Sequence, residues 1–79
     1  MNEAMREPTF GEKAVGLTFN PGGSTQVNEI KKDFAQIIDR LNTLRDITQS
    51  QEIKRMLSIA ITEAQTAQMW AVKAVTWQY

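Results

Sequence analysis

The sequence STQVNEIKKDFAQIIDRLNTLRDI, residues 24–47, has the clearest helical pattern in this chain. Its apolar residues recur every three or four positions, the spacing that places side chains on one face of an α-helix. These residues are Val27, Ile30, Phe34, Ile37, Ile38, Leu41 and Leu44. Ser24 or Thr25 is able to cap such a helix by accepting a hydrogen bond from a free backbone N–H of the first turn. We therefore predict an amphipathic helix that begins at about Ser24.

A second helix is predicted for residues 51–77. It follows the segment DITQSQ, residues 46–51, which interrupts the apolar periodicity and offers Thr48 or Ser50 as a cap. The predicted helix contains no Gly or Pro, and it would extend about 40 Å at ~1.5 Å per residue. So short a connection between two long helices predicts an antiparallel helical hairpin. The fold class is therefore all-α.

The second helix has two apolar faces. One becomes narrow and alanine-rich toward its C-terminal half, and it consists of Ile53, Leu57, Ala60, Ala64, Ala67, Ala71 and Ala74. The neighbouring face carries large aromatics and a cation, and it consists of Met56, Ile59, Glu63, Thr66, Trp70, Lys73 and Trp77. Because one hairpin cannot cover both faces by folding on itself, we expect self-association into a closed, symmetric homo-oligomer.

The chain before the hairpin is rich in turn-forming residues. Residues 1–9 show no apolar periodicity, and the following residues 10–23 contain all four glycines and Pro21. Such a composition predicts no long helix before Ser24. We therefore divide the chain into a flexible N-terminal segment and loop, residues 1–23, and a helical hairpin domain, residues 24–79.

Size and composition exclude several classes of protein. A chain of 79 residues buries little surface on its own, and it has no Cys for a disulfide and no His or Cys for a typical zinc site. The formal net charge is zero, which argues against binding to a polymeric nucleic acid. No apolar run approaches the roughly 18 residues of a membrane span. We expect a cytoplasmic protein that does not bind a membrane.

Catalysis is not expected either. Without His or Cys the chain lacks the most frequent general base and the thiol nucleophile. Its carboxylates are more typical of solvated partners of Lys or Arg than of an acid and base pair. We therefore assign no catalytic residue, no metal and no cofactor.

Three residues of the second helix are candidates for ligand binding. Trp70, Lys73 and Trp77 share one sector of the helix. Indole rings stack on nucleobases, and a nearby ammonium neutralises a phosphate. The alternative is that this face only packs against another subunit.

Three further candidates lie near the start of the first helix. Phe19 offers a stacking ring and Asn20 an amide that is able to pair with a base edge. Lys31 borders the apolar face of the helix, whereas its neighbour Lys32 does not. The alternatives are an aromatic anchor for the N-terminal segment and an ordinary solvated pair of lysines.

Three stretches of the sequence resemble a known family. GLTFNPGG, VNEIKKDFAQIIDRLN and AITEAQTAQMWAVKAVTW are similar to the hairpin domain that phage anti-CBASS and anti-Thoeris sponge proteins share, over about Gly16 to Trp77. The resemblance implies homo-oligomers, commonly hexamers, that bind cyclic oligonucleotides or cyclic ADP-ribose isomers made by bacterial immune enzymes. It also implies that the signal is held without being cleaved.

The resemblance assigns a role to individual residues. In the branch that binds cyclic dinucleotides, a Lys at the end of an N-E-I-K stretch meets the ligand, and residues 28–31 of this chain match that stretch. Lys31 is therefore the expected ligand contact. A Tyr before the first helix stacks on the base in that branch, whereas this chain has Gly16 at the usual spacing and Phe19 as the substitute.

The resemblance thus implies a function for the hairpin domain, which would carry both oligomerisation and ligand binding. The protein would sequester cyclic di- or trinucleotides in the cytoplasm of the host bacterium and block activation of CBASS effectors. Two alternatives remain open at this point. One is a sponge for the cyclic ADP-ribose signals of Thoeris, and the other is a small helical phage protein with a structural or assembly role.

Overall fold

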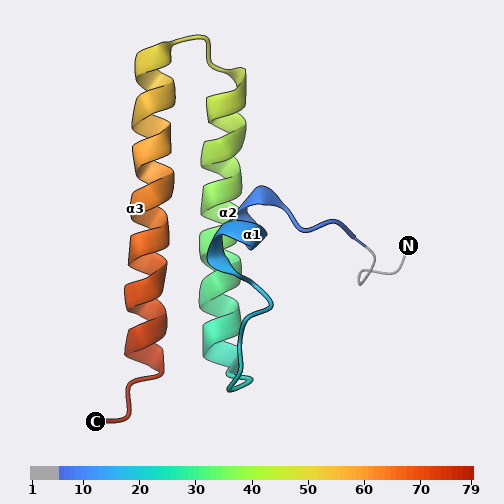
Figure 1. Ribbon diagram of the computed structural model, residues 1–79, viewed down its shortest axis with the longest axis vertical. Helices are drawn as coiled ribbons and strands as arrows, with labels where there is room; N and C mark the ends of the chain where they lie inside the picture. The colour runs from blue at the N-terminus through green and yellow to red at the C-terminus, as the bar shows by residue number, and fades with distance from the viewer. Residues whose placement is uncertain (1–5) are drawn as a thin grey trace.

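The computed structural model describes residues 6–79, which form three helices and no strand. Helix α1 spans Phe10–Val15, α2 spans Thr25–Ile47 and α3 spans Gln51–Val75. Helices α2 and α3 stand side by side in opposite directions, and α1 lies across them (Figure 1). The predicted all-α antiparallel hairpin is therefore confirmed for these residues. Residues 1–5 of the predicted N-terminal segment lie outside the described part of the chain.

Both long helices begin at a serine. The Ser24 hydroxyl accepts a hydrogen bond from the Val27 backbone N–H at 3.2 Å, and the Ser50 hydroxyl accepts one from the Ile53 N–H at 3.2 Å. Each bond satisfies a donor that has no partner within its own helix. Of the two candidates for each cap, the structure therefore uses Ser24 and Ser50.

The core lies where α1 covers the contact between α2 and α3. Its most buried member, Ile38, has no exposed surface, and Val15, Ala35 and Ile61 are buried around it. Five half-buried apolar residues pack against this cluster, namely Ala14, Leu17, Phe34, Leu41 and Ala64. A core of this size leaves much apolar surface of the two long helices exposed.

Helix α1 was not among the predicted elements. It is six residues long, so the prediction that no long helix precedes Ser24 still holds. The helix begins with a capping box, in which Thr9 Oγ1 accepts from the Glu12 N–H at 3.1 Å and Glu12 Oε1 accepts from the Thr9 N–H at 2.8 Å. It ends at Gly16, whose φ of 62° is the left-handed conformation that favours glycine. The T-x-x-E spacing of residues 9–12 was the signal that would have predicted this helix.

Helix α1 is held on α2 through Gly11. Its backbone N–H donates to Asp39 Oδ1 at 2.7 Å, and a Cβ atom at this position would lie only 2.1 Å from the carbonyl oxygen of Ala35. Only glycine allows the two helices to approach this closely. Glycine is unfavourable for helix formation, but Gly11 is required for the packing of α1 against α2.

The two most buried residues of helix α3 belong to neither of the faces described from the sequence. They are Ile61 and Gln68, each 5% exposed. The alanine-rich face is half-buried or exposed, and one of its members, Ala64, packs against the core cluster. The aromatic face that includes Trp70 and Trp77 is exposed. In the described residues, no helix is long and apolar enough to cross a membrane.

Candidate ligand-binding site

The six predicted binding residues form two sets at the open end of the hairpin, opposite the connection between α2 and α3 (Figure 1). The loop set is Phe19, Asn20 and Lys31, and the α3 set is Trp70, Lys73 and Trp77. Within residues 6–79, the hydrogen bonds and ring contacts of these side chains stay inside each set or its neighbouring loop. The fold therefore brings together the members of each set, but it does not join the two sets.

Lys31 is the buried cation of the loop set. Its side chain comes from the second turn of α2, and the residue is 5% exposed. The ammonium donates hydrogen bonds to the carbonyl oxygens of Gly16, at 2.9 Å, and of Phe19. None of the ion pairs in the described residues includes Lys31. A buried charge without an opposite charge is costly, and here only two carbonyl dipoles and one aromatic ring offset that cost.

The aromatic ring beside Lys31 is that of Phe19. Its centroid lies 5.5 Å from the Lys31 ammonium nitrogen, within cation–π range. The residue is 73% exposed, although its backbone N–H donates to the Gly16 carbonyl oxygen at 2.9 Å and its own carbonyl oxygen accepts from Lys31. The Phe19 ring is thus accessible, whereas the backbone N–H and carbonyl oxygen of the same residue are both hydrogen-bonded.

Asn20 uses its side-chain amide within the loop. Nδ2 donates to the Ser24 carbonyl oxygen at 2.8 Å, and Oδ1 accepts from the Ser24 N–H at 3.2 Å. The Asn20 carbonyl oxygen also accepts from the Gly23 N–H at 3.0 Å, where Gly23 has a φ of 64°. The amide predicted to pair with a base edge is therefore directed at the backbone of Ser24.

The α3 set is an exposed aromatic cluster. The Lys73 ammonium nitrogen lies 5.0 Å from the ring centroid of Trp70 and 5.6 Å from that of Trp77. With Ala74, these side chains line a shallow hollow of about 250 Å³. Tyr79 was not predicted to belong to this cluster, but its ring packs edge-on against Trp77 with centroids 5.4 Å apart. The only sequence signal for this contact was the position of Tyr79, two residues after Trp77.

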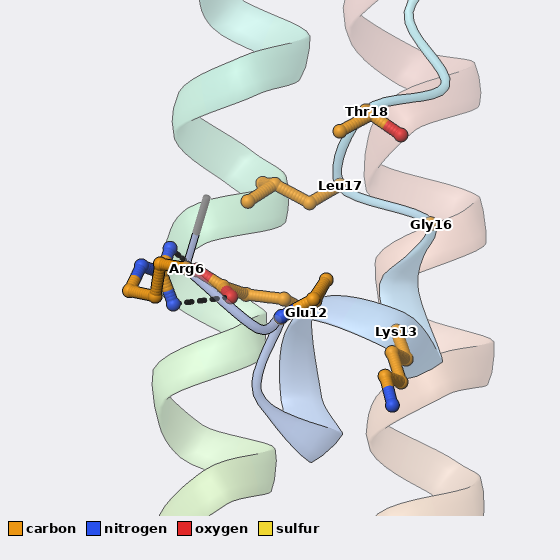
Figure 2. A pocket seen from close by; sticks show the side chains of 7 residues that line it. Arg6, Glu12, Lys13, Gly16, Leu17 and Thr18 are labelled. Atoms are coloured by element: carbon orange, nitrogen blue, oxygen red, sulfur yellow. Dashed lines mark hydrogen bonds and ion pairs between the residues drawn. The ribbon is translucent and has the colours of Figure 1, made fainter. Parts of the chain in front are cut away.

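A larger hollow, of about 490 Å³, lies where residues 6–8 approach α1 and the following loop (Figure 2). The Arg6 guanidinium spans both carboxylate oxygens of Glu12, and each N–O distance is 2.9 Å. This ion pair, together with the Thr9 N–H, lowers the pKa of Glu12 to about 2. The hollow was not predicted from the sequence. The Glu12 carboxylate pairs with Arg6 and caps α1. We therefore assign this part of the hollow a structural role.

The described residues suit binding by stacking and charge. They include no group of three or more acidic side chains that could hold a metal ion. The two sets instead provide rings for stacking and ammonium groups for a phosphate. Such a site can hold an aromatic anion in place.

Fold and site together define a small helical hairpin domain with aromatic and cationic groups at its open end. The chain belongs to the Acb2/Tad1 hairpin-domain family, since the model described as "Acb2/Tad1, hairpin domain" matches residues 12–76. This is the family of anti-CBASS and anti-Thoeris sponges, so the resemblance stated from the sequence is confirmed. The match begins inside α1 and includes the loop before α2. No curated protein and no solved structure matches the chain.

Proposed function

We propose that the protein binds cyclic di- or trinucleotides and holds them without cleaving them, so that these immune signals do not activate CBASS effectors. Family membership supports a sponge role of this general kind. The observation that carries the choice of ligand is the juxtaposition of the buried Lys31 ammonium and the exposed Phe19 ring. A cyclic nucleotide offers both a phosphate for the first and a base for the second.

The charge of Lys31 favours an anionic ligand. An ammonium has three N–H donors, and two of them bind the carbonyls of Gly16 and Phe19. A phosphate oxygen that accepts from the third donor would supply the missing negative charge. Lys32, one residue further on, is exposed, and we give it no role in binding.

The α3 set adds a second stacking surface, which we propose meets the ligand at contacts between copies of the chain. Large apolar side chains remain exposed along both long helices, namely Ile37, Leu44, Ile47, Ile53, Met56, Ile59 and Met69. Exposed apolar surface of this kind favours association. A closed homo-oligomer, of which a hexamer is the form expected for this family, would bury it and bring the α3 set of one copy to a pocket shared with another.

Sequestration requires tight binding but no catalytic group. A preformed pocket between rigid helices reduces the ordering cost of binding. We propose that the protein acts by stoichiometric binding in the cytoplasm of the infected cell, where the signals are made.

Calorimetry of the purified protein with a panel of cyclic di- and trinucleotides tests the proposal. We expect binding at micromolar or lower concentration by at least one of them, and chromatography of the released ligand should return it unchanged. Mass measurement of the intact complex gives the number of chains and ligands. Binding of cyclic ADP-ribose isomers alone would favour the Thoeris alternative, binding of no ligand would favour a structural protein, and an altered ligand would show an enzyme.

A further inference from the structure

The exposed Phe19 ring stands on a short loop that is bonded at several points. Before the ring, the Phe19 N–H donates to the Gly16 carbonyl oxygen at 2.9 Å. At the residue itself, the carbonyl oxygen accepts from the buried Lys31. The next residue, Asn20, closes the loop onto Ser24. A side chain that is 73% exposed thus has a backbone with little freedom left.

The two bonds of the Asn20 amide reach the residue that caps α2. Both of them are made to the backbone of Ser24, whose hydroxyl caps α2 at the Val27 N–H. The amide therefore connects Asn20, the residue that follows Phe19, directly to the N-terminal end of α2. Lys31, one to two turns further along α2, connects Phe19 to the same helix.

We infer that Asn20 is a positioning residue, which promotes ligand binding by fixing the Phe19 ring against α2 and not by contact with a base. This inference rests on the proposed function, because it assumes that Phe19 stacks on the ligand. Binding to an aromatic side chain that is already held in place avoids the entropy cost of ordering it. Asn20 has no role in distinguishing one base from another, since its amide is directed at Ser24.

A double-mutant cycle tests this inference. The variants are Phe19→Ala, Asn20→Ala and the double substitution, and the probes are cyclic di-AMP and cyclic di-GMP with the intact chain. Phe19→Ala should weaken binding roughly tenfold or more, as expected for loss of one stacked base. Asn20→Ala should weaken binding about threefold to tenfold, the cost of ordering one side chain. In the Phe19→Ala background, Asn20→Ala should have no further effect.

Two further variants separate positioning from stability. Ser24→Ala removes the hydroxyl cap of α2 but keeps the backbone groups that Asn20 contacts, so it should lower the thermal midpoint while leaving affinity nearly unchanged. Asn20→Ser retains a short acceptor for the Ser24 N–H, and it should recover part of the affinity that Asn20→Ala loses. Far-UV circular dichroism checks that every variant keeps its helices, which we expect because Asn20 lies outside the core cluster.

The outcomes are distinguishable from failure of the proposed function. If the unmodified protein binds neither probe nor any other cyclic nucleotide, the proposed function fails. If it binds, but the losses from Phe19→Ala and Asn20→Ala simply add, Asn20 acts independently of Phe19 and the inference is overturned. A loss on Asn20→Ala that differs between the adenine and guanine probes would also overturn it, because it would show that the amide contacts the base.

Discussion

The loop before α2 and the last turns of α3 both carry exposed aromatic rings, but their surroundings differ. In the loop, the ring of Phe19 is supported by a buried lysine and by an amide that closes the backbone. At the end of α3, the Lys73 ammonium lies near the ring of Trp70 and near that of Trp77, which follows the last residue of the helix. Both tryptophans are exposed. The backbone of the loop is therefore fixed by bonds within one chain, whereas the rings of the α3 set have no such polar support in the described residues.

Two sets with exposed aromatic rings can therefore differ in how firmly the chain holds those rings. The polar groups of the loop form hydrogen bonds within the chain, and these bonds fix the position of one ring. Substitutions there should therefore affect both stability and binding. In the α3 set, Trp70 and Lys73 lie on a regular helix and Trp77 follows its end, and all three are exposed. Substitutions there should affect binding alone.

The largest effect is expected for Gly11→Ala, in the helix that precedes the loop. The added Cβ would lie 2.1 Å from the Ala35 carbonyl oxygen, a backbone atom that cannot move aside easily. Alanine favours helix formation, but the overlap should outweigh that gain and lower the free energy of unfolding by about 3 kcal/mol. Urea unfolding measures the change.

Gly22→Ala is the matched control, because a Cβ at Gly22 meets nothing within 4 Å and its φ is not positive. Its unfolding free energy should stay within about 0.5 kcal/mol of the original value. Equal effects of the two substitutions would show that α1 is not docked through Gly11.

Lys31→Met should lower both stability and affinity. It leaves the carbonyls of Gly16 and Phe19 without their buried donor, which should cost about 2 kcal/mol in the free energy of unfolding. Calorimetry should show that binding of the cyclic nucleotide is lost. The control is Lys32→Met, at an exposed position, which should retain both properties. If Lys31→Met bound as well as the unmodified protein, its ammonium would have no part in the site.

Trp77→Ala should separate affinity from the stability of the single chain. The residue is 59% exposed, and its ring lies within cation–π distance of Lys73 and edge-on to Tyr79. Unfolding of the free chain at low protein concentration should change by less than about 0.5 kcal/mol, while affinity should fall roughly tenfold. Gln78→Ala, at the neighbouring exposed position, should leave affinity unchanged. A large loss of stability at every protein concentration would contradict the distinction between the two regions.

The smallest effect is expected from acid. Because Arg6 and the Thr9 N–H hold the pKa of Glu12 at about 2, below its ordinary value of 4.5, the unfolded chain binds the proton more readily than the folded one. The contribution of Glu12 to stability is therefore complete above pH 4.5 and is lost as the pH falls toward 2. The protection of α1 amides, which is the intrinsic exchange rate relative to their observed rate at the same pH, should fall over this range, and Glu12→Gln should remove that part of the pH dependence. Unchanged protection would show that the capping box does not depend on the charge.

The hairpin could be predicted because its signals are local. Helix periodicity, a capping residue at the start of each long helix and the absence of Gly and Pro after Ser50 are all features of neighbouring residues. The structure confirms both helices and uses Ser24 and Ser50 of the two cap candidates at each start. The grouping of Trp70, Lys73 and Trp77 followed from the angle of about 100° between successive residues of a helix. Lys73 lies near both rings, although the helix ends at Val75, two residues earlier than predicted, and Trp77 lies beyond it.

The loop set could be predicted only as a list of residue types. The positions of Phe19 and Lys31 suggested a ring and a cation, but the sequence does not show that Lys31 is buried under the loop or that Asn20 faces Ser24. Both facts depend on how α1 and the loop return across α2. Helix α1 was not predicted because Gly11 and Gly16 are unfavourable for helix formation. The sequence does not show the close packing against α2 that requires Gly11.

An all-α hairpin, two candidate caps for each long helix and a resemblance to the family could all be predicted from the sequence, because they depend on residue types and their spacing along the chain. Packing of the helices set which cap is used at each start, which residues of α3 face the core and how Gly11 docks α1. It also decided that Lys31 binds the carbonyls of Gly16 and Phe19. The physical reason is that burial and hydrogen bonding of these groups depend on residues far away in the sequence, whose approach is fixed only when the helices pack.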